Sequence, residues 1–219
     1  MKNIKGVIFD MDGLIFDTEA IYYKVQQETA DRLGIPFSKE IYLEYIGVAD
    51  EEVFVDLHER YASHGKELVQ QFIDESWGET HRIFKAGEVE LKPGALELLQ
   101  FLEENQIPRI VASSNVRPII EVLLEHAQIR DKFQGIVSAE DVQLAKPDPE
   151  IFMIARERLG TEAEETLVLE DAHHGVMAAV GAAIPVIMVP DLIPPSEELK
   201  EKTEAVFTSL HDVIDYIQA

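Results

Sequence analysis

Short apolar segments that alternate with helix-like segments are the feature that most restricts the fold of this chain. Each segment holds four to six residues, rich in β-branched types, so we predict buried strands. The predicted strands are residues 4–9, 108–112, 135–138, 166–169, 185–189 and 205–208. The predicted helices between and after them are residues 95–104, 117–126, 150–159 and 210–217. This alternation favours an α/β fold with a Rossmann-like parallel sheet and helices on both of its faces.

Residues 17–85 interrupt the alternation, because they show helical periodicity and no convincing strand. Ile21, Val25, Thr29 and Leu33 fall on one helical face, and Gly34 is a plausible stop for that helix. The α/β pattern resumes at the Leu-Lys-Pro-Gly segment of residues 91–94. We therefore predict an α/β core domain formed by residues 1–16 and 86–219, with a small all-α domain inserted at residues 17–85.

Composition excludes some classes of function. The net charge of −23 argues against nucleic-acid binding, which needs a basic surface, but it allows a small phosphorylated substrate at one locally positive site. The chain has no cysteine, so a disulfide framework and a thiolate metal site are excluded. No apolar run reaches the roughly 18–20 residues that cross a bilayer, and residues 1–13 lack a signal-peptide pattern. We expect a cytoplasmic protein, with no membrane and no protein partner implied.

Two carboxylates leave the first predicted strand in the segment Asp10-Met11-Asp12-Gly13. Residues at i and i+2 of a strand point to the same side, and paired carboxylates are costly without a cation or a catalytic task. Asp10 could attack phosphorus as a nucleophile, and Asp12 could exchange a proton with the leaving group and then with water. An ordinary turn is the alternative interpretation, since Asp and Gly favour turns.

Ser113, Ser114 and Asn115 follow the second predicted strand directly. Hydroxyl groups and free backbone N–H groups at a strand end can hold phosphate oxygens, aided by the N-terminus of the next helix. The same residue types are preferred as helix N-caps, so a purely structural role is the alternative. The two interpretations are compatible.

Lys146 lies in a segment whose backbone is restricted by its neighbours. Pro147 favours extended geometry at the residue before it, and Asp148 with Pro149 resembles an N-cap followed by a helix start. A lysine positioned in this way would hold a phosphate group as a point charge. A solvated surface lysine is the usual alternative.

Glu170 and Asp171 end the fourth predicted strand as an adjacent acidic pair. Mg²⁺ prefers oxygen ligands, usually one or two carboxylates with water and substrate phosphate, so this pair is a candidate magnesium site. Acidic residues also suit a helix N-terminus, which is the alternative. Each of the four segments follows a predicted parallel strand, so all should meet at the carboxyl edge of the sheet, where ligands bind. Together they predict a phosphoryl-transfer site.

The four segments, taken in order, resemble the haloacid dehalogenase-like hydrolase superfamily over the whole chain. The matching motifs are DMDGLIFDTE (residues 10–19), VASSN (111–115), AKPDPEIF (145–152) and LEDAHHGVMAA (169–179). The resemblance implies that Asp10 becomes an aspartyl-phosphate and that Asp12 is the general acid and base. It assigns Ser113 and Lys146 to the transferred phosphoryl group. It assigns Mg²⁺ to Asp10, the carbonyl of Asp12 and Asp171, with Glu170 as a further ligand or a supporting partner, and makes the helical insert a cap.

The closest subgroup resembles β-phosphoglucomutases and sugar-phosphate phosphatases. True dehalogenases lack the second aspartate of the first motif, which is present here as Asp12, so dehalogenation is not expected. The mutases carry a histidine just after the first motif and a cap arginine for a second phosphate. The matching helix here reads Glu19-Ala20-Ile21-Tyr22-Tyr23, and residues 47–52 carry acids. We therefore predict a phosphatase that acts on a small phosphorylated metabolite of the sugar-phosphate class. A phosphomutase is the alternative, and a non-enzymatic binding module is a third interpretation.

Substrate choice should depend on the insert. Tyr22, Tyr45, Phe54 and Trp77 are candidate lining residues, although aromatic residues at helical spacing more often belong to a core. Arg117 could add positive charge near the site, with a solvated arginine as the alternative. We assign neither His173 nor His174 to the metal, because Mg²⁺ prefers oxygen ligands.

Overall fold

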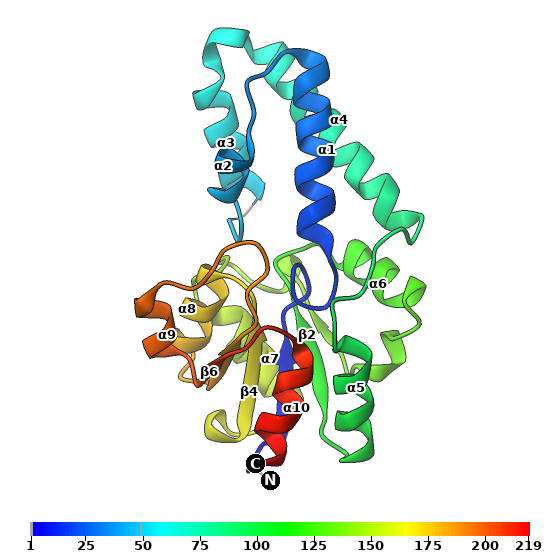
Figure 1. The fold of residues 1–219 in the computed structure, drawn as a ribbon, viewed down its shortest axis with the longest axis vertical. Coiled ribbons are helices and arrows are strands. Elements are labelled where there is room, and N and C mark those ends of the chain that lie inside the picture. Colours follow the sequence, from blue (N-terminus) through cyan, green and yellow to red (C-terminus); the bar gives the residue numbers. More distant parts are fainter. Residues whose placement is uncertain (1, 49) are drawn as a thin grey trace.

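Six parallel strands form the sheet at the centre of the lower part of the molecule (Figure 1). The computed structural model describes residues 2–48 and 50–219. The strands are β1 (Gly6–Phe9), β2 (Arg109–Ala112), β3 (Ile136–Val137), β4 (Thr166–Glu170), β5 (Val186–Met188) and β6 (Ala205–Val206). Their order is β3-β2-β1-β4-β5-β6, and every neighbouring pair is parallel. The α/β prediction and all six strands are confirmed, with strand ends displaced by two residues at most.

Helices cover both faces of this sheet, as the strand–helix alternation predicts. One face packs on α5 (Ala95–Glu104), α6 (Arg117–His126) and α10 (Leu210–Gln218). The other packs on α7 (Glu150–Leu159), α8 (His173–Gly181) and α9 (Glu197–Lys202). Strand β1 is buried on both sides because successive side chains alternate: Val7 and Phe9 join the first layer and Ile8 the second. Short 3₁₀ turns lie at Arg130–Lys132, Ala139–Asp141 and Ala163–Glu165.

Four helices form the upper part of the molecule (Figure 1). They are α1 (Thr18–Leu33), α2 (Lys39–Leu43), α3 (Asp50–Arg60) and α4 (Lys66–Lys85), with a 3₁₀ turn at Ala62–His64. Gly34 adopts a left-handed conformation and ends α1, as predicted. This helical region has its own buried cluster, in which Leu57, Val69 and Phe72 are fully enclosed. A separate core is what an inserted domain needs, although the proposed domain boundaries themselves stay a prediction.

Two chain segments join the helical region to the sheet, and they run side by side (Figure 1). The N–H of Asp17 donates to the carbonyl of Glu90 at 2.9 Å, and the N–H of Lys92 donates to the carbonyl of Ile15 at 2.8 Å. The side chain of Lys92 lies 3.7 Å from Asp17 and 2.6 Å from Asp191 of the sheet part. The paired segments therefore form one narrow connection.

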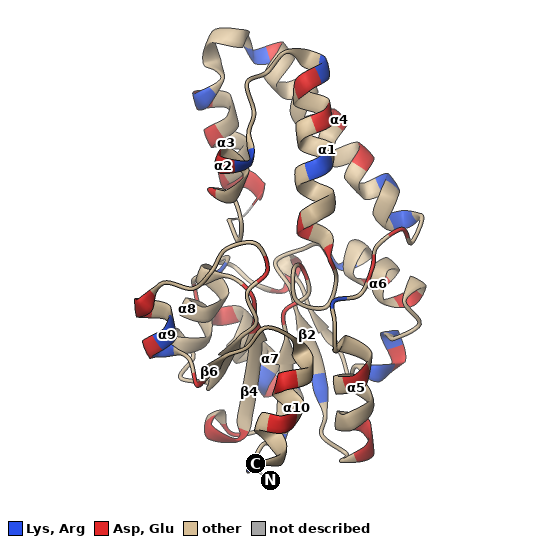
Figure 2. Ribbon diagram, viewed as in Figure 1, with Lys and Arg blue, Asp and Glu red and all other residues tan. Residues whose placement is uncertain are grey.

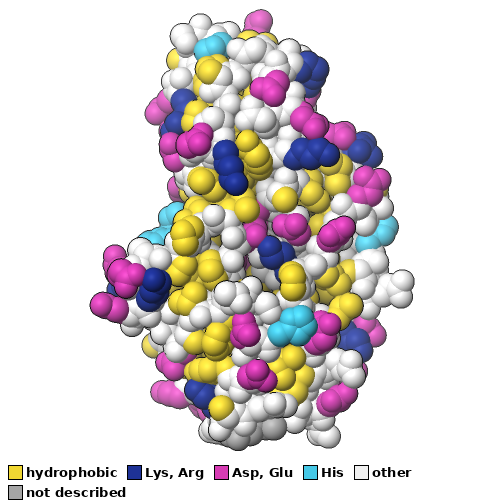
Figure 3. Space-filling model, in the orientation of Figure 1, with side chains coloured by type: hydrophobic (Ala, Val, Ile, Leu, Met, Phe, Trp, Pro, Cys, Tyr) yellow, Lys and Arg dark blue, Asp and Glu magenta, His cyan; other side chains and the backbone are white. Residues whose placement is uncertain are grey.

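The surface reflects this two-part organisation. The outline narrows where the parts meet, and hydrophobic side chains gather there (Figure 3). Acidic residues are spread over both parts rather than gathered on one (Figure 2). Within residues 2–48 and 50–219, no helix combines the length and the apolar character needed to cross a membrane.

Candidate active site

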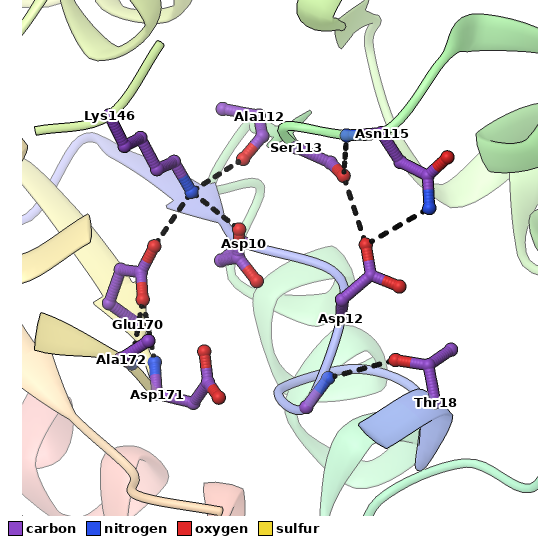
Figure 4. Close-up of polar contacts among 11 residues, drawn as sticks. Asp10, Asp12, Thr18, Ala112, Ser113, Asn115, Lys146, Glu170, Asp171 and Ala172 are labelled. Atoms are coloured by element: carbon purple, nitrogen blue, oxygen red, sulfur yellow. Dashed lines mark hydrogen bonds and ion pairs between the residues drawn. The ribbon is translucent and has the colours of Figure 1, made fainter. Parts of the chain in front are cut away.

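The carboxyl ends of β1, β2 and β4 bring the predicted site residues together (Figure 4). In the strand register Phe9 lies opposite Val111 on one side and Leu169 on the other. The residues that follow these three strands therefore leave the sheet at the same height along the strand direction. This is why Asp10, Ser113 and Glu170, far apart in the sequence, lie at one edge of the sheet.

The ammonium group of Lys146 reaches this edge between Asp10 and Glu170 (Figure 4). Its ammonium group lies 2.5 Å from Asp10 Oδ1 and 2.7 Å from Glu170 Oε1, and its side chain is only 6% exposed. Burial alone would lower the pKa of Lys146, but the two carboxylates outweigh that effect and raise it. Lys146 is therefore a fixed positive charge beside Asp10, and the alternative of a solvated surface lysine is wrong.

Asp10, Glu170 and Asp171 form a buried acidic cluster whose ligand atoms all lie within 4.8 Å of one another. Burial raises the pKa of Asp10 and of Asp171, and the neighbouring carboxylates act in the same direction. One lysine does not balance three carboxylates, so the cluster has the charge and the oxygen donors that a divalent cation needs. The donor set fits Mg²⁺.

Glu170 differs from the other two members because both of its oxygens are already engaged. Oε1 accepts from Lys146, and Oε2 accepts from the backbone N–H groups of Asp171 and Ala172 at 2.9 Å each. Gly175 makes room for this side chain, since a Cβ there would lie 1.6 Å from Glu170 Oε1. This geometry favours Glu170 as a residue that positions Lys146 and Asp171, more than as a direct metal ligand.

The backbone after Asp12 passes very close to the acidic cluster. A Cβ at Gly13 would lie 2.4 Å from Asp171 Oδ2, and Gly13 has a φ of +77° that other residues rarely adopt. The N–H of Gly13 donates to Thr18 Oγ1 at 3.2 Å, which anchors the turn. Only glycine permits this approach, so the Asp12–Gly13 peptide stays within reach of a cation held by Asp171.

Asp12 points away from the cluster, toward the end of β2 (Figure 4). Its Oδ2 accepts from Ser113 Oγ at 3.2 Å and from Asn115 Nδ2 at 3.5 Å. Its Oδ1 is buried and has no partner among the described residues. Burial raises the pKa of Asp12, while the nearby polar side chains of Thr18, Asn115 and Ser113 oppose the rise. Asp12 therefore has one oxygen held in place and one free for a proton, and its side chain is not part of the candidate metal cluster.

Some local predictions for these segments need correction. Helix α6 has Val116 as its N-cap, without a side-chain hydrogen bond, so Ser113, Ser114 and Asn115 do not cap it. Ser114 is exposed and borders two cavities, whereas Ser113 is fully buried. The N-cap of α7 is Pro149, one residue after the predicted Asp148. Asp148 nevertheless accepts from the N–H of Glu150 at 3.0 Å.

A cavity of about 130 Å³ lies beside Asp12, between the sheet edge and the helical region. Tyr22, Tyr45 and Trp77 line it, but Phe54 does not and instead packs edge-to-face on Trp77. Sequence reasoning missed further lining residues, among them Glu19, Gln26 and Tyr42. The signal that could have found Glu19 and Gln26 is spacing: with Tyr22 they lie three and four residues apart on α1, which is one helical face.

Burial raises the pKa of Glu19 to about 7, with the Tyr42 hydroxyl opposing the shift and Asp12 adding to it. The Tyr42 hydroxyl donates to the Glu19 carboxylate. Arg117 does not reach the site, because it pairs with Asp141 at 2.7 Å. His173 is exposed, and His174 lies against Gly47 of the helical region. Neither histidine belongs to the acidic cluster.

A parallel α/β sheet with an acidic cluster and a buried lysine at its carboxyl edge, joined to a helical insertion, defines a class of hydrolases. The sequence model described as "Haloacid dehalogenase-like hydrolase" matches residues 7–189. The chain belongs to this family, and the resemblance stated from its motifs is confirmed.

The relatives of the chain include several phosphatases. A "Phosphorylated carbohydrates phosphatase" of Thermotoga maritima is 32% identical over 181 residues, covering 83% of this chain and 82% of the relative. A "(DL)-glycerol-3-phosphatase 2" of Arabidopsis thaliana is 30% identical, covering 86% and 80%. Among solved structures, a β-phosphoglucomutase of Clostridium difficile superimposes with a TM-score of 0.79 at 25% identity, covering 98% and 96%. The chain is thus a phosphatase-type hydrolase of this family.

Proposed function

We propose that this chain is a Mg²⁺-dependent phosphomonoesterase that acts on a small phosphorylated metabolite, a sugar phosphate, through an aspartyl-phosphate on Asp10. The observation that carries the proposal is that Asp10 and Asp12 have different surroundings, suited to a nucleophile and to a proton donor. Asp10 is held by Lys146 beside the acidic cluster, and Asp12 keeps one oxygen free beside a cavity. The names of the curated phosphatase relatives support the substrate class. A cytoplasmic location remains a prediction from the sequence.

In this proposal Mg²⁺ is held by Asp10, Asp171 and the backbone carbonyl of Asp12. Glu170 positions Lys146 and Asp171 through its hydrogen bonds to them. The bound cation would balance the charge of the phosphate group as it is transferred. Lys146, Ser113, Ser114 and Asn115 contact the phosphate oxygens. Ser114 and Asn115 border the cavities on both sides of the proposed phosphate position, which agrees with that role.

The reaction proceeds in two steps on these side chains. A carboxylate oxygen of Asp10 forms a bond to phosphorus as the bond to the ester oxygen breaks, and Asp12 Oδ1 gives its proton to that leaving oxygen. Asp12 then takes a proton from a water molecule, whose oxygen attacks phosphorus and releases inorganic phosphate from Asp10. The raised pKa of Asp12 suits a group that must carry the proton at the start.

The helical region acts as a cap in this proposal. It supplies Glu19, Tyr22 and Gln26 to the cavity beside Asp12, and its closure would exclude bulk water while the substrate is bound. Tyr22 stands in the segment where the mutases have a histidine, and its hydroxyl accepts from Asn115 Nδ2 at 3.2 Å. The absence of that histidine favours hydrolysis over phosphoryl return to the sugar.

The test is phosphate release from a panel of sugar phosphates, polyol phosphates and p-nitrophenyl phosphate, with Mg²⁺ or with chelator. Asp10→Asn should abolish Mg²⁺-dependent release, because an amide cannot form the acyl phosphate. Its fold should persist, since Lys146 keeps Glu170 as a partner. Asp131→Asn is the matched control, an exposed aspartate in a 3₁₀ turn, and should keep the wild-type rate.

Near-native turnover by Asp10→Asn would show that Asp10 is not the nucleophile. The mutase alternative has its own signature, the conversion of β-glucose 1-phosphate to glucose 6-phosphate after addition of a bisphosphate primer, without phosphate release. That result in place of hydrolysis would replace the phosphatase proposal.

A further inference from the structure

The cavity beside Asp12 is where the group released from phosphate must lie if the proposed function holds, because Asp12 forms part of its wall. The sheet edge contributes Asp12, Ser114 and Asn115. The helical region contributes the remaining wall, from α1, α2, α3, α4 and the segment between α2 and α3. The chemistry of this wall therefore bears on the kind of leaving group that fits.

Apart from tyrosine hydroxyls, the ionisable side chains of the wall are all acidic. Asp12, Glu19 and Asp50 contribute carboxyl groups, and no Lys, Arg or His is among the lining residues in the described part of the chain. The neighbouring cavity differs, since it includes Lys146 and His81. A second phosphate or a carboxylate in the Asp12 cavity would face carboxyl groups without a counter-charge, and such like-charge contacts are strongly unfavourable.

Two of the lining residues also carry hydrogen-bond acceptors, Gln26 and Glu19. Gln26 is only 4% exposed, and its Oε1 is buried without a partner among the described residues. An unpaired buried polar atom costs free energy, and a ligand that donates a hydrogen bond to Gln26 Oε1 would remove that cost. Tyr42 occupies only Oε2 of the Glu19 carboxyl group. An acceptor two helical turns from a carboxyl group, on the same face of α1, suits a ligand with more than one hydroxyl or N–H donor.

The aromatic residues of the wall already have partners for their polar atoms. Trp77 Nε1 donates to Asp50 Oδ2 at 3.0 Å, and the Tyr45 hydroxyl donates to Asp56 Oδ2 at 2.5 Å. Their rings consequently offer apolar surface more than hydrogen bonds. This combination of ring surface and acceptors matches the faces and hydroxyl groups of a polyol or a sugar.

We propose, as an extension of the phosphatase proposal, that the Asp12 cavity selects phosphomonoesters whose leaving group is uncharged and carries hydroxyl or N–H donors for Gln26 and Glu19. It rejects phosphomonoesters whose leaving group carries a second phosphate or a carboxylate. Gln26 and Glu19 are thus the specificity-determining residues of the helical region.

The first test compares kcat/KM for substrates that differ only in that charge. Glycerol 3-phosphate is paired with 3-phosphoglycerate, and fructose 6-phosphate with fructose 1,6-bisphosphate. We expect a preference of at least about ten-fold for the uncharged member of each pair. Equal rates within both pairs, by an enzyme that hydrolyses p-nitrophenyl phosphate, would overturn the selectivity and leave the phosphatase intact. No hydrolysis of any substrate, p-nitrophenyl phosphate included, would overturn both proposals.

The second test removes the acceptors. Gln26→Leu should lower kcat/KM for the uncharged substrates about three- to ten-fold, the value of one hydrogen bond, and leave p-nitrophenyl phosphate, which lacks donors, within about two-fold. Glu19→Gln should narrow the gap between the charged and uncharged members of each pair. Gln71→Leu makes the same change on the exposed face of α4 and should alter neither. If Gln26→Leu and Gln71→Leu behave alike on every substrate, Gln26 does not contact the leaving group.

Discussion

At the scale of single residues, two aspartates separated by one residue have different environments. Asp10 faces Lys146 and the acidic cluster, whereas Asp12 faces Ser113 and Asn115. Two carboxyl groups with different surroundings can hold different protonation states, which is how one site supplies both a nucleophile and an acid. The turn at Gly13, directly after the two aspartates, carries the chain past Asp171.

Asp12→Asn tests the role of the free oxygen on Asp12. The amide keeps the shape but cannot donate a carboxylic proton, so kcat/KM for a sugar phosphate should fall by about 10²–10⁴-fold. The fall should be much smaller for p-nitrophenyl phosphate, whose leaving group departs without a proton. Measuring kcat/KM isolates formation of the aspartyl-phosphate from its hydrolysis. An equal loss on both substrates would mean that Asp12 acts through positioning alone.

The residues that follow strands could be predicted from the sequence as one site, whereas the cavity residues of the helical region could be predicted only in part: Tyr22, Tyr45 and Trp77 line the cavity as expected. Parallel strands end at one edge of the sheet, and this brings together Asp10, Ser113, Lys146, Glu170 and Asp171. The rule holds wherever the helical region is placed. Which face of α1 points toward the sheet depends on how the helical region is placed. A pattern of buried residues on α1 cannot distinguish its own core from a cavity wall, so Glu19 and Gln26 were not identified.

At the scale of helices and strands, amphipathic periodicity predicted α5, α6 and α7 with the observed bounds. It failed for α8, where the acidic pair indicated a helix start but no end. Helix α8 contains two glycines and is buried along Gly175, Val176, Ala178 and Ala179, so it lacks a polar face. Helices α2 and α9 are five and six residues long, too short for a period to be visible.

The paired segments that join the two parts depend on Lys92. Its side chain bridges Asp17 at the start of α1 and Asp191, whose side chain is 7% exposed. Asp191 Oδ2 has no partner within the described residues, so Lys92 supplies its main compensation. Lys92→Met should therefore destabilise the protein by about 3 kcal/mol, the typical result of breaking one side of a buried pair.

Urea unfolding measures this change. The matched control is Lys132→Met, since the ion pair of Lys132 with Glu103 lies at the surface with both side chains at least a third exposed. It should cost less than about 1 kcal/mol. A second substitution, Asp191→Asn, should restore most of the stability that Lys92→Met loses, because it removes the buried charge. Equal costs for the two lysine variants would show that the connection does not depend on Lys92.

At the scale of the whole molecule, the net charge of −23 and the acidic cluster both lower the stability of the folded state. Negative charges spread over both parts repel one another, and three of the acidic residues are gathered in the buried cluster with one lysine beside them. Folding therefore brings together groups that the unfolded chain keeps apart and hydrated. A cation bound only by the folded state offsets this cost, so metal binding and stability are linked.

Thermal unfolding with and without Mg²⁺ makes that linkage measurable. At a Mg²⁺ concentration of about 100 times Kd, the folded state gains about 2.7 kcal/mol, which corresponds to a rise of about 5–10 °C in Tm for a chain of this size. Asp171→Asn removes a proposed ligand and one buried charge. It should melt above the wild type in chelator, because the raised pKa of Asp171 marks an unfavourable charge, yet respond far less to Mg²⁺. Asp131→Asn should keep the wild-type response. A full Mg²⁺ response in Asp171→Asn would place the cation elsewhere. A general loss of packing would lower the Tm in chelator, so it cannot produce the expected combination of a higher Tm in chelator and a smaller rise in Tm with Mg²⁺.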